Sequence, residues 1–117
     1  NRADSTYETE PAKTKITFRH LLTHTSGIGY GFIQPEAGFF YGQKGIPDAF
    51  VTANWKLGDK ITQLAEVPLL HQPGERFTYG LGVYLAGYLV EVISGKNLAQ
   101  FMQERIFGPL GMVDTYF

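Results

Sequence analysis

The sequence predicts a mainly α-helical structure with long ordered loops, for three reasons. Hydrophobic residues make up 44% of the 117 positions and charged residues 18%, which is typical of a chain that folds around a core. Apolar residues recur at helical spacing in several segments. Glycines gather between Gly27 and Gly45, where their conformational freedom opposes regular structure. A chain of this length can bury about two thirds of its unfolded surface.

The N-terminal part of the chain divides into two stretches of different character. Residues 1–15 are polar, contain Pro11 and show no period, so they predict an extended leading segment. Residues 16–117 form the predicted helical subdomain. At its start, Thr17 is expected to cap a short helix over residues 18–22.

Residues 27–45 predict a long ordered loop. They contain six glycines, which disfavour a helix or strand, and five aromatic side chains, which need a place to be buried. Ordered loops of this length are usually functional. The five aromatic residues are Tyr30, Phe32, Phe39, Phe40 and Tyr41.

Two short helices are predicted in the middle of the chain. Pro47 suits the first position of a helix over residues 47–56. Asp59 is expected to cap a helix over residues 60–67, which Pro68 ends. The residues expected to face inward are Phe50 and Trp55 in the first helix and Ile61, Leu64 and Ala65 in the second.

The segment from Gly80 to Ser94 predicts the most apolar helix. Its only strongly polar interior residue is Glu91, so most of its circumference must be covered by other protein. Gly82 and Ala86 lie one turn apart and would let a neighbour approach closely. Gly95 is placed to end the helix as its C-cap.

Two further local signals flank this helix. Residues 72–75 carry proline and then glycine at their centre, which predicts a type II turn. Asn97, with Gln100 three residues later, predicts a capping box at the start of a helix over residues 98–107. The inner face of that helix would consist of Leu98, Phe101 and Ile106.

Composition excludes several classes of function. The formal net charge is -1 with no run of basic residues, so the sequence predicts no nucleic-acid partner. The longest apolar run, Leu81 to Val90, is far shorter than the ~20 residues that span a bilayer. The absence of cysteine excludes a thiolate metal site and a cysteine nucleophile. A small molecule is therefore the expected partner.

The sequence also predicts no metal site. His20 and His24 have the spacing of a zinc-binding helix, but Leu21 occupies the position that needs a catalytic glutamate, and no third ligand is evident. We expect His20 to lie at the surface and His24 to form a hydrogen bond within its turn.

No serine of this chain has the pattern of a Ser-x-x-Lys nucleophile, in which a lysine one helical turn away takes the hydroxyl proton. The three serines are Ser5, Ser26 and Ser94, and the residues three positions after them are Glu8, Gly29 and Asn97. A Gly-x-Ser-x-Gly elbow is absent as well. Composition and spacing alone therefore leave the function open.

Three blocks of sequence nevertheless resemble the β-lactamase-related serine hydrolases, the group of class C β-lactamases, penicillin-binding proteins and esterases. Residues 16–28 are similar to its I-T-x-x-x-L-L-T-H-T-S-G-L block. Residues 68–79 are similar to P-L-x-x-x-P-G-x-x-F-x-Y, and residues 106–117 to I-F-x-P-L-G-M-x-D-T-x-F. The resemblance covers about residues 16–117.

The resemblance implies an α+β parent of the β-lactamase/transpeptidase-like fold, of which this chain is a mostly helical internal fragment. It also implies three motifs in one active site and no cofactor. Tyr79 matches the tyrosine of the second motif, Tyr-x-Asn. The first motif, Ser-x-x-Lys, would lie upstream of Asn1, and the third, a Lys-Thr-Gly-like or His/Trp-x-Gly strand, downstream of Phe117.

The chemistry of a phenol and the helix that follows Tyr79 both affect its implied role as a catalytic base. The positive end of the following helix would stabilise a phenolate by about 0.3–1 kcal/mol. A phenol holds its proton tightly at neutral pH, so the role also needs a neighbouring lysine. Without the resemblance, Tyr79 would be read as one of seven tyrosines that pack a core.

The chain departs from the family pattern at Leu81, where the Tyr-x-Asn motif has asparagine. A leucine side chain cannot form a hydrogen bond with the amide of a β-lactam or peptide. The resemblance therefore favours an esterase with a Ser-Lys-Tyr acyl-enzyme mechanism, with Leu81, Tyr30 and Phe32 in contact with a small ester or β-lactam-like substrate. The alternatives are a β-lactamase or D-alanyl-D-alanine carboxypeptidase, and a non-catalytic relative that binds a ligand.

Overall fold

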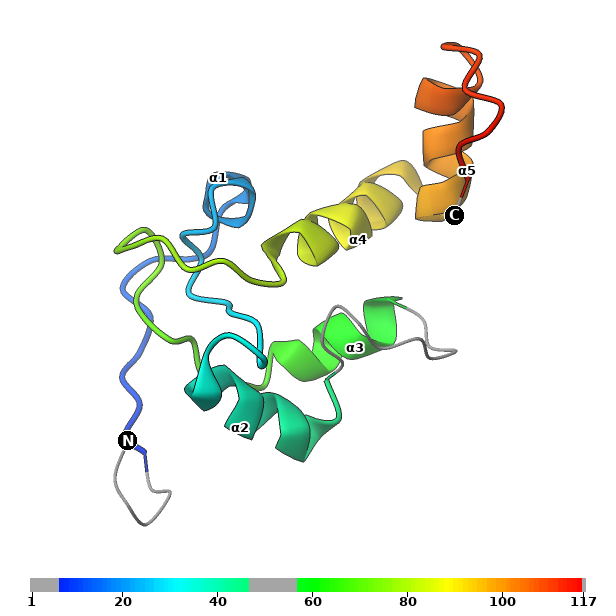
Figure 1. Cartoon of the computed structure of the whole chain (residues 1–117). Coiled ribbons are helices and arrows are strands. Elements are labelled where there is room, and N and C mark those ends of the chain that lie inside the picture. Colours follow the sequence, from blue (N-terminus) through cyan, green and yellow to red (C-terminus); the bar gives the residue numbers. More distant parts are fainter. Residues whose placement is uncertain (1–6, 47–56, 117) are drawn as a thin grey trace.

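Helices joined by irregular segments make up the computed structural model of the chain, which describes residues 7–46 and 57–116 (Figure 1). No strand occurs in these two ranges, which agrees with the predicted helical character. The elements are α1 (Phe18–Leu22), α2 (Pro35–Lys44), α3 (Leu57–Leu64), α4 (Gly82–Ser94), α5 (Leu98–Met102) and a π-helical turn, η1 (Gln103–Phe107).

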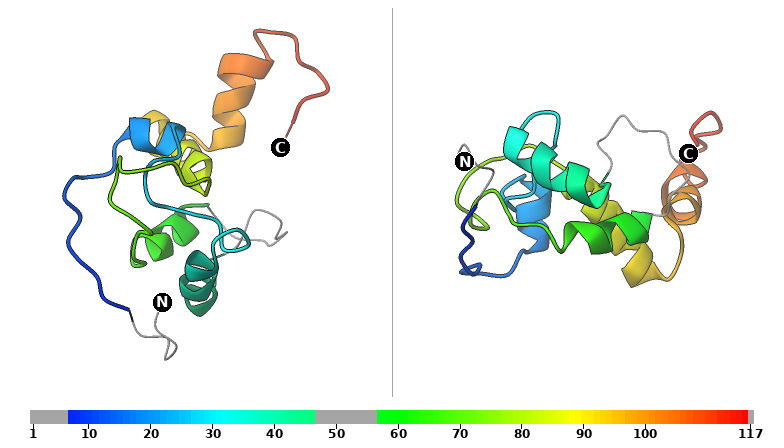
Figure 2. Two further views of the ribbon diagram at one scale, coloured as in Figure 1. Left: turned by 60° about the vertical axis from the view of Figure 1, so that its left-hand side comes forward. Right: turned by 90° about the horizontal axis from the view of Figure 1, so that it is seen from below.

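The helices are arranged around α4. This helix contacts α1, α3 and α5, while α2 packs against α3. The C-terminal helix projects away from the other helices at the far end of α4 (Figure 2). The radius of gyration is 16.0 Å, compared with about 13 Å for a compact domain of this length. The chain is therefore more extended than a self-contained domain.

The core lies where α1, the segment over residues 27–34, α2 and the start of α4 meet. Its largest members include two tyrosines, and most of the rest are aliphatic side chains. The cluster consists of Leu21, Ile28, Tyr30, Ala37, Tyr41, Ile46, Leu64 and Leu81.

Helix α1 has the bounds and the cap that the sequence predicts. The backbone N–H of His20 donates to Thr17 Oγ1 at 3.2 Å, and the Thr17 N–H donates to His20 Nδ1 at 3.3 Å. The close approach predicted at Gly82 is also present. A Cβ at that position would lie 2.7 Å from the Leu21 carbonyl oxygen, so a larger residue would push α4 away from α1.

The prediction of one long loop over residues 27–45 is wrong in its second half, which is α2. Pro35 occupies the first turn, and Gly45 ends the helix in the left-handed conformation with φ 59°. Ala37 and Tyr41, one turn apart, are both buried. Start and stop signals together with this buried stripe outweigh the helix-breaking tendency of the glycines. Residues 27–34 are irregular, as predicted.

Helix α3 begins at Leu57 and ends at Leu64, three residues earlier at each end than predicted. Asp59 consequently lies in the first turn and not at the N-cap. The chain tightens after Leu64 because Glu66 and Val67 donate to carbonyls three residues back. Leu64 is buried as expected, whereas Ala65 is exposed. The predicted helix over residues 47–56, with Phe50 and Trp55, lies outside the described residues.

The Lys44 ammonium links the end of α2 to the segment after α3. It donates a hydrogen bond of 2.6 Å to Glu66 and lowers the pKa of that carboxyl below its ordinary value. The contribution of this pair to stability is therefore present above the unfolded-state pKa of Glu66 and is lost as the pH falls. Both side chains are exposed, so the contribution is small.

Helix α4 ends as predicted, at Gly95 in the left-handed conformation with φ 68°. The predicted type II turn before it is also confirmed, because Gly74 has φ 86° and the Glu75 N–H donates to the Gln72 carbonyl at 3.1 Å. The other described segments leave part of the apolar surface of α4 uncovered. Val83, Val92 and Ile93 are 55%, 59% and 72% exposed.

The C-terminal helix covers the predicted range but changes its winding. Asn97 Oδ1 accepts from the Gln100 N–H at 2.8 Å, which confirms the N-cap half of the predicted capping box. After Met102 the helix continues as η1, which adds one residue to a turn. This added residue rotates the side chains that follow. Phe107 is consequently buried, and Ile106, predicted to face inward, is 36% exposed.

Candidate active site around Tyr79

Tyr79 lies on a short segment that runs beside residues 28–30. The Leu81 N–H donates to the Gly29 carbonyl at 3.3 Å. Between these residues the backbones nearly touch, because a Cβ at Gly80 would lie 2.2 Å from the Ile28 carbonyl oxygen. Main-chain contacts thus fix where Tyr79 stands, three residues before the first residue of α4.

The Tyr79 ring packs between aromatic neighbours and remains 50% exposed. Its centroid is 5.3 Å from that of Tyr30 and 4.7 Å from that of His24. The ring of Tyr30, which is buried, in turn lies 5.1 Å from that of Phe32, which is 51% exposed. The structure therefore brings three of the predicted site residues into one row, from the exposed Phe32 through Tyr30 to Tyr79.

Leu81, the fourth predicted site residue, has a different environment. Its side chain is 6% exposed and belongs to the core cluster. It stands at the N-cap of α4. The side chain therefore lies among the apolar residues that support the Tyr79 segment, while Tyr79 and Phe32 are at the surface.

Gln34 is a residue of this site that the sequence does not reveal. Its Oε1 accepts from the Tyr30 N–H at 2.7 Å, and its Nε2 donates to the Tyr79 carbonyl at 3.4 Å. One side chain thereby links the two halves of the aromatic row. A Cβ at Gly29 would come within 2.5 Å of this Oε1. The link joins positions 45 residues apart, and no short motif signals such a contact.

The hydrogen bond expected from His24 within its turn comes from its backbone N–H, which donates to the Leu21 carbonyl at 3.3 Å, and not from its Nδ1. This Nδ1 is buried and has no partner, and the backbone of His24 has φ 53°. His20, by contrast, uses Nδ1 in the cap of α1. No cluster of three metal-ligating side chains occurs in the part of the chain that the structure describes.

The serines that the structure describes are engaged in turns. Ser26 is 2% exposed, and its Oγ accepts from the Ile28 N–H at 3.3 Å. Ser94 Oγ accepts from the Lys96 N–H at 3.2 Å. Ser5 lies outside the described residues.

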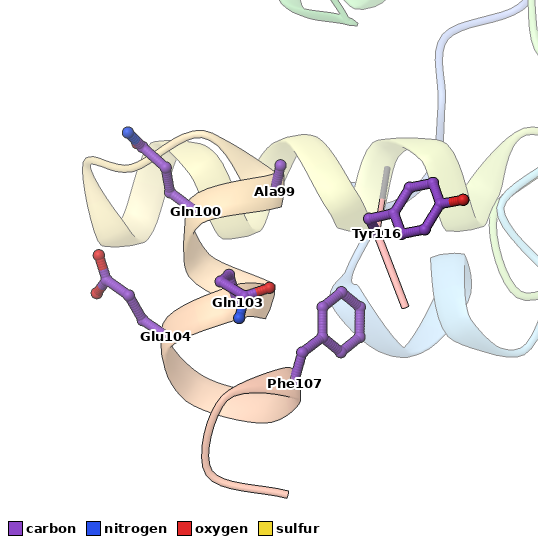
Figure 3. A pocket seen from close by; sticks show the side chains of 6 residues that line it. All are labelled: Ala99, Gln100, Gln103, Glu104, Phe107 and Tyr116. Carbon is purple, nitrogen blue, oxygen red and sulfur yellow. The ribbon is translucent and has the colours of Figure 1, made fainter. Parts of the chain in front are cut away.

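Two hollows lie away from Tyr79. One of 490 Å³ lies between the leading segment and residues 68–76. The other, of 390 Å³, lies at the C-terminal end (Figure 3). The side chains of Phe107 and Tyr116 lie on one side of the view, and the side chain of Glu104, which pairs with Lys96, lies on the other. Among the described helices, none has the length and apolar character needed to cross a membrane.

The comparisons with known proteins agree on one family. Residues 5–117 match the profile of the Beta-lactamase family. A lovastatin esterase from Penicillium rubens is 38% identical over 108 residues, which cover 92% of this chain and 26% of the esterase. The monacolin J acid methylbutanoyltransferase of Aspergillus terreus is 40% identical over 103 residues, which cover 88% of this chain and 23% of that protein.

A solved structure shows the same arrangement of helices. EstCE1, described as a hydrolase with promiscuous acyltransferase activity, matches with a TM-score of 0.75 and 35% identity over 82% of this chain and 25% of its own. The present chain therefore spans about a quarter of the length of the curated relatives that it matches.

Proposed function

Since this chain belongs to the Beta-lactamase family, we propose that it is part of a longer serine hydrolase that cleaves small esters through an acyl-enzyme. The observation that carries the proposal is the placement of Tyr79. Its half-exposed ring stands at the start of the long apolar helix and within an aromatic row, at the position that matches the family's tyrosine.

In the proposed reaction Tyr79 carries a proton. A serine oxygen, supplied from outside these 117 residues, bonds to the acyl carbon of the ester, and Tyr79 passes the serine's proton to the departing alkoxide. Water then attacks the acyl-serine, which releases the acid and restores the serine. The aromatic row, ending at Phe32, is suited to contact the acyl chain of the ester.

The exposed apolar surface supports a longer protein. Part of α4 and most of the tail after η1 present large hydrophobic side chains to solvent, an arrangement that usually marks a surface covered by other protein. The exposed large hydrophobic residues of the tail are Leu110, Met112, Val113 and Tyr116.

Labelling with a fluorophosphonate tests the missing nucleophile. We expect the full-length protein to be labelled on a serine outside this chain, which lies in a Ser-x-x-Lys motif. The 117-residue chain by itself is expected to remain unlabelled and to leave p-nitrophenyl esters intact. Stoichiometric labelling of Ser5, Ser26 or Ser94 would contradict the proposal, and an unlabelled full-length protein would favour a non-catalytic, ligand-binding relative.

The replacement of the family's asparagine by Leu81, whose side chain lies in the core, supports a preference for esters over β-lactams, because this position presents no carboxamide to a substrate. A leucine offers no hydrogen bond to a substrate amide, and an unpaired amide costs about 1–3 kcal/mol, or a factor of about ten to a hundred and fifty in rate. We expect kcat/KM for a short- to medium-chain p-nitrophenyl ester to exceed that for nitrocefin by at least this factor. Equal turnover of both substrates by one preparation would favour the β-lactamase or carboxypeptidase alternative.

Transfer of the acyl group to an alcohol is a second candidate. It is favoured by the similarity to a methylbutanoyltransferase and to a hydrolase with promiscuous acyltransferase activity. In this reaction an alcohol replaces water in attacking the acyl-serine, and Tyr79 takes the alcohol's proton. The two outcomes are separated by measuring whether an added alcohol yields a new ester or only free acid.

A further inference from the structure

His24 combines two unfavourable features in one residue. It is the only residue other than glycine with positive φ in the described ranges, at 53°. Its Nδ1 is buried without a hydrogen-bond partner, although a buried polar atom normally has one. Such costs persist in a fold when the surroundings impose them, and they gather at functional sites.

The turn itself does not explain why a histidine stands here. The left-handed conformation is less costly for glycine or asparagine, and neither would leave an imidazole nitrogen unpaired. The turn depends on the backbone of this residue, because the His24 carbonyl accepts a hydrogen bond from the Thr78 N–H at 2.7 Å. Asparagine or glycine would supply the same carbonyl.

The imidazole ring adds a contact that neither residue could supply. Its centroid is 4.7 Å from that of Tyr79 and 5.8 Å from that of Phe77. His24 thus contacts the Tyr79 segment in two ways. Its carbonyl accepts a hydrogen bond from the Thr78 N–H, and its ring packs against the side chains of Phe77 and Tyr79, which flank Thr78. Because Nδ1 is buried, this atom is not placed to exchange a proton with a substrate.

We propose that His24 is a positioning residue whose ring fixes the orientation of the Tyr79 side chain. The inference rests on the proposed role of Tyr79 in proton transfer. A tyrosine that is half exposed samples several rotamers unless its ring is packed. Proton transfer requires the phenol oxygen within hydrogen-bond distance of the reacting atom, and a displacement of 1 Å costs about a hundredfold in rate.

The test compares variants of the full-length protein. His24→Asn keeps the turn and the carbonyl bond but removes the ring. We expect kcat for a p-nitrophenyl ester to fall about 10- to 100-fold, with KM within about threefold. The thermal midpoint should stay close to that of the wild type, because asparagine tolerates the left-handed conformation better, and this gain opposes the loss of ring packing. His24→Phe restores a ring and is expected to recover much of kcat, and His20→Asn is the matched control.

A spectroscopic measurement does not depend on activity. With 3-fluorotyrosine incorporated, the Tyr79 ¹⁹F signal, assigned by its loss in Tyr79→Phe, should shift in His24→Asn and stay in place in His20→Asn. An unmoved signal overturns the inference, as does a loss of thermal stability in His24→Asn that parallels the loss of kcat. If the wild type hydrolyses no ester, the proposed function fails, while the signal still decides whether His24 orients Tyr79.

Discussion

Replacement of Tyr79 by phenylalanine is expected to lower kcat of the full-length enzyme by about 10²–10⁴, the range for loss of a positioned acid–base group. Phenylalanine keeps the ring that packs against His24 and Tyr30, so the fold should be preserved. Only the phenol oxygen, to which we assign the proton transfer in the proposed reaction, is removed. Steady-state hydrolysis of a p-nitrophenyl ester gives kcat, and the thermal midpoint shows whether the variant remains folded.

A matched control for this variant is Tyr84→Phe. The Tyr84 ring meets the ring of Tyr30 edge-on at 6.5 Å, so the control removes a phenol oxygen from a neighbouring position in the same cluster. We expect its kcat to stay within about twofold of the wild type. If Tyr79→Phe also stays within threefold, Tyr79 is a packing residue and the proposed mechanism is wrong.

Replacement of Gly80 by alanine is expected to destabilise the protein by about 3 kcal/mol, the upper end of the range for overpacking. The new Cβ would lie 2.2 Å from the Ile28 carbonyl oxygen and 2.5 Å from Gly29 Cα. Both are backbone atoms, so no change of rotamer relieves the clash. Urea unfolding of the full-length protein measures the change through a shift of the midpoint at unchanged m.

Gly42→Ala is the control for steric effects at glycine. Gly42 lies inside α2, and a Cβ there has no neighbour within 4 Å. This variant is expected to stabilise the protein by about 0.5–1 kcal/mol, because alanine loses less backbone entropy in a helix. Similar unfolding midpoints for the two alanine variants would show that the segments around Gly80 can separate at little cost.

Local signals in the sequence predicted several helix ends and one turn correctly, although the cap expected at Asp59 was wrong. The cap at Thr17, the turn centred on Gly74 and the left-handed stop at Gly95 each depend on residues within a few positions of one another. Their geometry is determined by short-range hydrogen bonds and by the φ values that glycine tolerates. Such features need no knowledge of the rest of the chain.

Features that depend on distant partners were missed. Because of the glycine content, α2 was predicted as loop. Its buried residues Ala37 and Tyr41 pack against a core to which other segments contribute. The winding of η1, which exchanges Ile106 for Phe107 at the interior, has no sequence signature. The resemblance pointed to Tyr79, but not to the bridge from Gln34 or to the ring of His24, because both contacts join positions far apart in the chain.

The near contact of main chains at Gly80 has a consequence for how the substrate range of this protein can change. Backbone atoms and the hydrogen bond from the Gln34 side chain to the Tyr79 carbonyl hold the Tyr79 segment in place, while the exposed end of the aromatic row, at Phe32, takes part in neither contact. If the proposed function holds, we expect mutations at Phe32 to alter which acyl groups are accepted while the backbone contacts that hold the Tyr79 segment stay intact. In laboratory evolution aimed at new esters, substitutions at Phe32 are therefore expected to be tolerated best, and substitutions at Gly80 least.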